Sequence, residues 1–349
     1  MTGLRKRRIV NNPNPSGSSR WYLVEDFRVR GKRGRTTKYI GPESPKNEEE
    51  SDRLRKRFFL EMEQEAINKK SELSTLTYRY DLSSMPEAAS SSFPITIKLL
   101  ERLRFTCQSI DRILATSEID YYEGDIETRY VHGTTFIEGN TLSLRDTYRL
   151  LEEGIAPKDK SLREINEVQN FRAVRAFREK YKGKVDLAFI RKLHSLIMNN
   201  IDFESAGKFR RTDDIGIFGI ELKPTPAMMI EDELQEAIDD YYHGLEEGQY
   251  PFFLAVILHQ RFESIHPFTD GNGRVGREVF NYLLLRDGMP RLIFLGKDRE
   301  VYLQALQKGD EGDVFGMIMD FSELMVNQRL KVAEDRLRKL GESIKADSK

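Results

Sequence analysis

One short stretch of the chain, IHPFTDGNGRVGR at residues 265–277, combines residue types that could bind a polyphosphate. Glycines at 271 and 273 permit positive φ and leave no Cβ in the path of an anion. The N–H groups of such a loop, followed by a helix N-terminus, form an anion site. Arg274 and Arg277 are three residues apart, so one helical turn could present both guanidinium groups to phosphates.

Two other residues of this stretch could do chemistry on the bound group. Asp270 supplies carboxylate oxygen, the ligand that a phosphate-bridging divalent cation prefers. His266 has an ordinary pKa of about 6.5 and could take a proton from a hydroxyl near neutral pH. The stretch therefore predicts a base, a metal ligand, an anion loop and a charge clamp within a dozen residues.

The glycines also match the dinucleotide pattern G-x-G-x-x-G, which must follow a strand and open a helix. The preceding residues, 251–265, instead repeat their apolar positions at helical spacing. The other common phosphate loop, G-x-x-x-x-G-K-[ST], is absent because no Gly-Lys pair is followed by Ser or Thr. The sequence thus favours a helix, a phosphate-binding loop and a second helix.

The same stretch resembles the Fic-domain signature, H-x-F-x-[DE]-G-N-G-R-x-x-R, at every fixed position. The resemblance implies a mainly helical protein that transfers AMP from ATP to a Ser, Thr or Tyr hydroxyl of a target protein. It implies that His266 is the base, that Asp270 binds Mg²⁺ and that Phe268 packs into the core. The residues that it assigns to the phosphates are Gly271, Asn272, Gly273, Arg274 and Arg277.

Two further stretches are similar to the family. Residues 207–229 resemble the segment that leads into and forms the flap, a small β-hairpin around 213–226 that pairs with the target as an added strand. The flap residues expected to dock the target are Ile215, Gly216, Ile217 and Phe218. Residues 299–313 resemble the helix beside the adenine, where Tyr302 is the expected aromatic contact. Asp310 stands where the family often has Asn.

A possible inhibitory element precedes the signature. TTFIEGN, Thr134 to Asn140, matches the family's inhibitory motif [ST]-x-x-x-E-[GN]. Thr134 and Glu138 lie one turn apart on a helix expected around 124–140, so both face the same way. The Glu138 carboxylate is expected to form a bidentate pair with Arg277 and to take the place of the γ-phosphate. The alternative is that Glu138 is a plain surface carboxylate at a helix end.

The remaining sequence predicts how these elements are organised. We expect a basic β-hairpin arm over 1–50, a helix and linker over 51–94, a mainly α, Fic-type helical bundle over 95–325, and a charged C-terminal helix or tail over 326–349. In the arm, WYLVEDFRVR and RTTKYIG are expected strands joined by GKRG. Residues 83–94, SSMPEAASSSFP, are the expected linker.

The arm carries eleven Lys and Arg within residues 1–40 but only two acidic residues, Glu25 and Asp26. An arm packed on the main domain is favoured over nucleic-acid contact because base-reading motifs are absent. Nucleic-acid association, with a residual Fic site, stays open as an alternative function. So do removal of AMP, with Glu138 activating water, and transfer of another nucleotide-derived group.

Composition fits a soluble cytoplasmic protein, with 39% hydrophobic residues, 32% charged residues and a net charge of −1. The longest apolar run, FFLAVIL at 252–258, is too short to span a membrane, and no apolar signal-peptide region follows the basic N-terminus. Cys107 is the single cysteine, which excludes an internal disulfide. His259 is expected to support the motif helix, and His132, His194 and His243 lack metal-binding spacing. The expected partners are ATP, a protein target and, from the family, a second copy of the chain.

Overall fold

The structure is a computed structural model that describes residues 7–79, 87–114, 116–213, 224–294 and 296–346. It divides into two compact units, one formed by residues 1–119 and 325–349, the other by residues 120–324. The expected boundary at residue 95 therefore lies inside a helix of the first unit.

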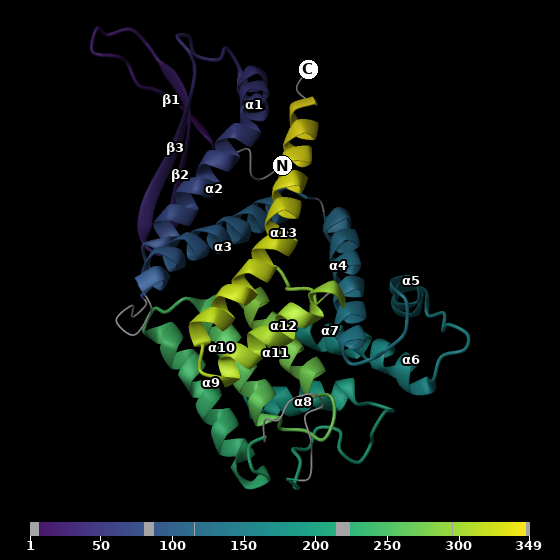
Figure 1. The fold of residues 1–349 in the computed structure, drawn as a ribbon. Helices are drawn as coiled ribbons and strands as arrows, with labels where there is room; N and C mark the ends of the chain where they lie inside the picture. Colours follow the sequence, from purple (N-terminus) through teal and green to yellow (C-terminus); the bar gives the residue numbers. More distant parts are fainter. Residues whose placement is uncertain (1–6, 80–86, 115, 214–223, 295, 347–349) are drawn as a thin grey trace. The chain divides into compact units, whose positions relative to one another are not determined.

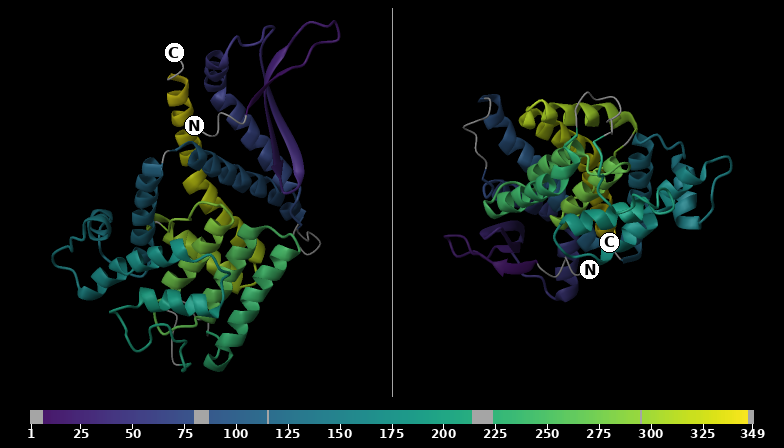
Figure 2. Two further views of the ribbon diagram at one scale, coloured as in Figure 1. Left: turned by 180° about the vertical axis from the view of Figure 1, so that it is seen from behind. Right: turned by 90° about the horizontal axis from the view of Figure 1, so that it is seen from below.

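The first unit combines a three-stranded antiparallel sheet with helices (Figure 1). Its elements are β1 (Arg8–Asn11), β2 (Trp21–Val29), β3 (Lys32–Gly41), α1 (Glu48–Arg57), α2 (Phe59–Thr75), α3 (Glu87–Ile113) and the C-terminal part of α13 (Val314–Ala346). The strand order is β1-β2-β3, and α2 runs along one face of the sheet (Figure 2).

The expected two-stranded arm is incomplete, because β1 adds a third strand in antiparallel register with β2, pairing Arg8 with Val24. This strand has only four residues, too few to show an alternating pattern beside the basic run that precedes it. The turn between β2 and β3 is also shorter than expected. Only Arg30 and Gly31 lie between the strands, both at positive φ (46° and 84°), as a tight hairpin turn requires.

A buried ion-pair cluster holds the sheet to α2. Arg7 is 1% exposed and donates to Glu25 of β2 at 3.0 Å and to Glu63 of α2 at 2.6 Å. A third bond, 3.2 Å long, reaches the Phe59 carbonyl. Glu63 also accepts a bond of 2.9 Å from Arg112 of α3. Arg7 thus bridges two buried carboxylates, one on the sheet and one on the helix, and Arg112 adds a second cation to Glu63.

The helices of this unit differ from the expected helix and linker. The first helical region is interrupted at Phe58, which ends α1 and precedes α2. The linker predicted at 83–94 is wrong from Glu87 onward, since α3 begins at that residue and carries Pro94 inside. The helix continues through this proline because Phe93 and Ile97 are buried in the core, so packing outweighs local preference.

The second unit is helical and contains the predicted phosphate loop. Its elements are α4 (Thr116–Ile137), α5 (Leu144–Tyr148), η2 (Arg149–Glu153), α6 (Leu162–Gln169), α7 (Phe171–Lys180), α8 (Leu187–Ile197), η3 (Ala227–Met229), α9 (Ile230–Glu246), α10 (Pro251–Ile265), α11 (Asn272–Arg286), η4 (Gly296–Asp298), α12 (Arg299–Asp310) and the start of α13. The prediction of a mainly α protein with a small sheet is confirmed.

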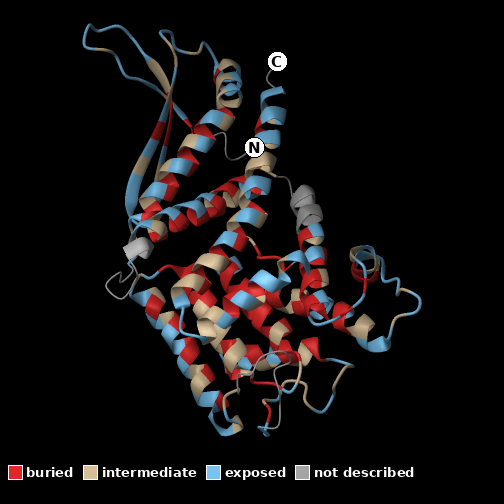
Figure 3. Cartoon of the chain, in the orientation of Figure 1, coloured by how far each residue is buried: buried red, intermediate tan, exposed pale blue. Residues whose placement is uncertain are grey.

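Helices α10 and α11 form the centre of this unit. Both are buried along most of their length (Figure 3), and α10 packs against α9, α11 and α12. A buried network joins α11 to α4: Arg178 of α7 donates to Glu278 at 2.7 Å and to Glu127 at 2.6 Å. The helix that carries the expected inhibitory motif is therefore tied to the helix that carries Arg277. Among the helices described, none is long and apolar enough to cross a bilayer.

Candidate active site

The signature residues form a tight loop between α10 and α11. His266 ends α10 with φ of 51°, and Gly271 precedes α11 with φ of 78°. Between them, the Asn272 side chain accepts from the Phe268 N–H and donates to the Phe268 carbonyl, both at 2.8 Å. Both polar groups of the Asn272 side chain thus brace the loop, and the expected contact of Asn272 with phosphate stays a prediction.

His194 on α8 contacts two residues of the loop, a role that the sequence did not indicate. Its ring stacks on Phe268 with centroids 3.7 Å apart and planes at 7°. Nδ1 accepts from the Gly207 N–H at 2.8 Å, so Nε2 carries the proton and donates to the Asp270 carbonyl at 3.0 Å. Burial lowers the pKa of His194 to about 4, so the ring is neutral at pH 7.

Arg210 holds the backbone around His266 through three hydrogen bonds. Its Nε donates to the His266 carbonyl at 2.9 Å and its Nη2 to the Ile265 carbonyl at 3.3 Å. The Arg210 N–H adds a bond of 3.0 Å to the Pro267 carbonyl. Three consecutive carbonyls are thus held by one residue, which stabilises the left-handed conformation of His266.

His266 itself is held in a form that suits a general base. Its Nδ1 lies 3.3 Å from the Glu263 carbonyl. Because a carbonyl only accepts, Nδ1 carries the proton and Nε2 keeps its lone pair. Burial lowers the pKa of His266, which outweighs the contact with the Glu263 carbonyl and keeps the ring neutral at pH 7.

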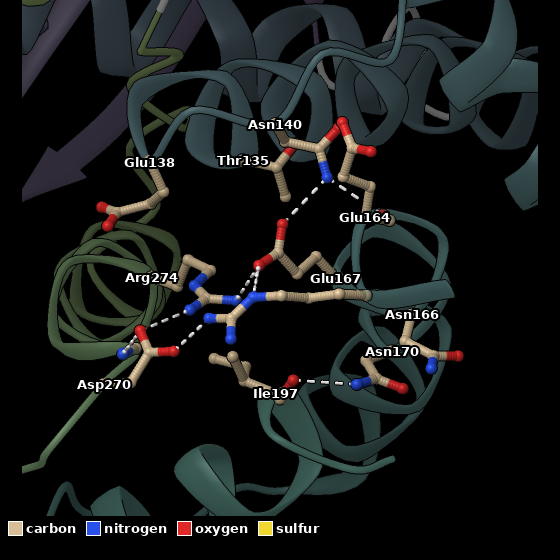
Figure 4. Close-up of polar contacts among 12 residues, drawn as sticks. Thr135, Glu138, Asn140, Glu164, Asn166, Glu167, Asn170, Ile197, Asp270 and Arg274 are labelled. Atoms are coloured by element: carbon tan, nitrogen blue, oxygen red, sulfur yellow. Dashed lines mark hydrogen bonds and ion pairs between the residues drawn. The ribbon is translucent and has the colours of Figure 1, made fainter. Parts of the chain in front are cut away.

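Asp270 and Arg274 belong to a charged network that reaches α6 (Figure 4). Arg274 donates to Asp270 at 2.9 Å and lies 3.4 Å from Glu167. Arg163 bridges the same two acids, donating to Glu167 at 3.2 Å and also to Asp270. Glu167 further accepts from Asn140, the last residue of the expected inhibitory motif, at 2.9 Å. Asp270 is therefore paired with two arginines.

Two features of this network suit a bound anion and cation. Arg274 is 1% exposed, and its Nε has no hydrogen-bond partner among the described residues. Burial would raise the pKa of Asp270, but Arg274 and Arg163 outweigh it, so the pKa is lowered and the group is ionised at pH 7. The described residues hold no cluster of three or more potential metal ligands. Asp270, with 35% of its side chain exposed, fits Mg²⁺ that takes its other ligands from phosphate and water.

Arg277 is engaged by the expected inhibitory motif. Its Nη2 donates to Glu138 at 2.6 Å and to the Thr134 carbonyl at 2.9 Å, and its Nε donates to the Thr134 hydroxyl at 2.8 Å. The predicted contact with Glu138 is present, but it is not bidentate, because Thr134 takes the Nε side of the guanidinium. Glu138 lies just beyond the end of α4, not within it.

Electrostatics and packing both favour this contact. Burial would raise the pKa of Glu138, but the charge of Arg277 outweighs it and the pKa is lowered. A Cβ at position 273 would collide with the Glu138 carboxylate and with Arg277. Gly273 is therefore needed for the carboxylate to reach the arginine.

The residues expected beside the adenine have supporting positions. Tyr302 is only 2% exposed, and its hydroxyl lies 2.9 Å from Nε2 of His259. The ring is covered by neighbouring side chains, and its expected contact with adenine stays a prediction. The expected support role of His259 is confirmed, with Tyr302 as its partner. Asp310 accepts from Ser264 at 2.6 Å and from Gln260 at 2.7 Å, both on α10.

Glu263 is a further carboxyl group at the site that the sequence did not single out. It lies one turn before His266, and burial raises its pKa to about 8. At pH 7 this group is mainly protonated, so the charge beside Arg277 comes from Glu138. The expected flap residues Ile215, Gly216, Ile217 and Phe218 lie outside the described residues.

Residues 184–284 match the family model described as the Fic/DOC family. Among curated proteins, the chain is 32% identical over 190 residues to protein adenylyltransferase fic-1 of Caenorhabditis briggsae, covering 53% of this chain and 37% of that protein. Protein adenylyltransferase Fic of Drosophila grimshawi is 31% identical over 193 residues, covering 53% and 38%. The chain thus matches less than two-fifths of the length of these relatives.

Solved structures share the fold. A Fic domain containing signaling protein from Bacteroides thetaiotaomicron has a TM-score of 0.62 and 22% identity, covering 69% of this chain and 98% of that one. Fic-1 of C. elegans, residues 134–508, has a TM-score of 0.58 and 24% identity, covering 81% and 85%. At these identities the likeness shows the fold alone.

Proposed function

Because residues 184–284 form a Fic domain, we propose that this protein is a protein adenylyltransferase, which transfers AMP from ATP to a Ser, Thr or Tyr hydroxyl of a target protein. The observation that carries the proposal is the His266 ring, whose Nδ1 is committed to the Glu263 carbonyl while Nε2 keeps its lone pair beside the anion loop.

In the proposed reaction, His266 Nε2 takes the proton of the target hydroxyl as its oxygen attacks the α-phosphorus of ATP. A bond forms between that oxygen and phosphorus, the bond to the β-phosphate oxygen breaks, and pyrophosphate leaves. Arg274 and Arg277 would neutralise the phosphates, together with the N–H groups at the start of α11. Mg²⁺ held by Asp270 would supply further positive charge to the phosphates.

We also propose that the protein restrains itself. The contact of Glu138 with Arg277 removes one of the two arginines from the phosphate site. A nucleotide would have to break a charge-assisted bond before its γ-phosphate could use Arg277. Docking of the target at the flap, a cytoplasmic setting and a homodimer are parts of the same proposal.

The proposal is tested with the Glu138→Gly protein, ATP and Mg²⁺ added to cell lysate, followed by mass spectrometry of the modified proteins. The expected result is a gain of one AMP unit on hydroxyl side chains, absent when His266→Ala is added to the same protein. Gain of another nucleotide-derived group, or labelling that survives His266→Ala, would contradict it. Binding of ATP by the double variant serves as the control for folding.

A further inference from the structure

The sheet of the first unit has one face that packs on α2 and one that faces solvent. Strand pairing places Tyr22 opposite Tyr39, Asp26 opposite Arg35, and Arg28 opposite Arg33. Arg8 and Val10 of β1 pair with Val24 and Tyr22 on this same face. Because paired residues share a face and alternate residues lie on opposite faces, these side chains form one surface.

Four arginines lie on this surface, and we name them the basic face: Arg8, Arg28, Arg33 and Arg35. All four are exposed, and Asp26 is the one acidic residue among the paired positions that share their side of the sheet. Asp26 forms ion pairs with Arg8 and Arg35. Arg28 and Arg33 form no ion pair with any described residue. Four arginines against one aspartate make this face positive, whereas the chain as a whole carries a net charge of −1.

The pairing of Arg28 with Arg33 lowers the stability of the isolated sheet. Like charges directly opposite each other in an antiparallel pair repel. Neither side chain contributes to the core, since both are exposed. Burial of Leu23 and Thr36 on the other face, and the Arg7 cluster, maintain the strands without them. An external anion would turn the repulsion into favourable binding.

From this arrangement we propose that the basic face binds the phosphate backbone of double-stranded DNA. A guanidinium fork matches phosphate oxygens, and all four cations of the face are arginine, not lysine. Arg28, Arg33 and Arg35 lie beyond Val24, where the pairing with β1 ends, so they stand side by side on β2 and β3 next to the two-residue turn, on the face opposite to α2. This inference is independent of the adenylyl transfer proposed above.

The test measures fluorescence anisotropy of a labelled 20-base-pair duplex with the 349-residue protein at 50 to 200 mM salt. Binding is expected to weaken steeply with salt, because displaced counterions drive it. The variant Arg28→Ala/Arg33→Ala is expected to bind about tenfold more weakly or worse at 50 mM salt, with a slope against log salt lower by about 2. Since both residues are exposed, circular dichroism should be unchanged, and the unfolding midpoint should not fall, because the substitutions remove a repulsion.

Arg53→Ala/Arg338→Ala is the matched control, since it removes two exposed arginines of the same unit away from the sheet. It should bind the duplex like the wild type. Three outcomes would overturn the proposal. These are no duplex binding at 50 mM salt, equal binding by the two double variants, and binding to anionic phosphatidylglycerol vesicles that the duplex does not compete away.

Discussion

Arg277 is the residue at which the proposed phosphate binding and the proposed restraint meet. In this structure it gives three hydrogen bonds to Thr134 and Glu138, and it is 1% exposed. Its pKa is raised because the Glu138 carboxylate outweighs the effect of burial, so its charge is permanent. The Glu138 carboxylate is the charged group at this contact that a substitution can remove without losing the arginine.

Glu138→Gly is therefore expected to tighten binding of Mg-ATP. Loss of a charge-assisted bond worth about 1.5–3 kcal/mol corresponds to roughly a tenfold to hundredfold gain in affinity. Isothermal titration calorimetry measures it directly. Glu153→Gly, which removes an exposed carboxylate paired with Arg149, is the control and should leave affinity unchanged. Equal affinities for wild type and Glu138→Gly would contradict the inhibitory role.

The residues whose neighbourhood could be predicted from sequence are those that lie close together along the chain. His266, Asp270, Arg274 and Arg277 stand within one turn-and-helix segment, where spacing fixes their neighbourhood. Glu138 was found through its own short motif. His194, Arg210 and Arg163 come from distant segments, and their roles depend on tertiary contacts that no spacing encodes. The burial of Tyr302 likewise depends on tertiary contacts, with His259 of α10 and with Phe294.

At the scale of elements, α6 and α8 determine how the loop presents its charges. Arg163 on α6 and Mg²⁺ would compete for the Asp270 carboxylate. Arg163→Ala is thus expected to lower the Mg²⁺ concentration needed for half-maximal nucleotide binding by about twofold to fivefold, the worth of a partly exposed ion pair. Magnesium titration with a fluorescent ATP analogue measures this. Arg149→Ala is the control, and an unchanged or higher requirement in Arg163→Ala would contradict the competition.

His194 makes the attachment of α8 to the loop dependent on pH. Its pKa is about 4 in the folded protein and about 6.5 when unfolded, so between these values the unfolded state binds more protons. Its contribution to stability is complete above pH 6.5 and is lost as the pH falls toward 4. From pH 7 to pH 5 that loss is about 2 kcal/mol.

His194→Gln keeps a donor and an acceptor but does not titrate. In differential scanning calorimetry, the unfolding temperature of this variant is expected to fall less between pH 7 and pH 5 than that of the wild type. His243→Gln, on the surface of α9, is the control, and its unfolding temperature should fall as much as that of the wild type. A wild-type-like loss in His194→Gln would show that its titration has no part in acid sensitivity.

At the scale of the whole molecule, the two units depend on different kinds of contact. The second unit surrounds α10 with helices and buries a continuous apolar core. In the first unit, a buried cluster of charged residues helps to attach a short sheet to α2. Helical periodicity predicted the helical core of the second unit. The buried charge cluster of the first unit was not predicted, because β1 is only four residues long and Arg7 stands within a run of basic residues.

Arg7→Ala is expected to destabilise the first unit strongly. It would leave Glu25 and Glu63 buried with one cation fewer, and removal of one partner from a buried pair costs about 3–5 kcal/mol. Trp21, the single tryptophan, lies on β2, so its fluorescence during urea unfolding reports on this unit. The neighbouring Arg8→Ala is the matched control, because its exposed pair with Asp26 contributes about 1 kcal/mol or less. Equal urea midpoints for the two variants would mean that the Arg7 cluster does not hold the sheet.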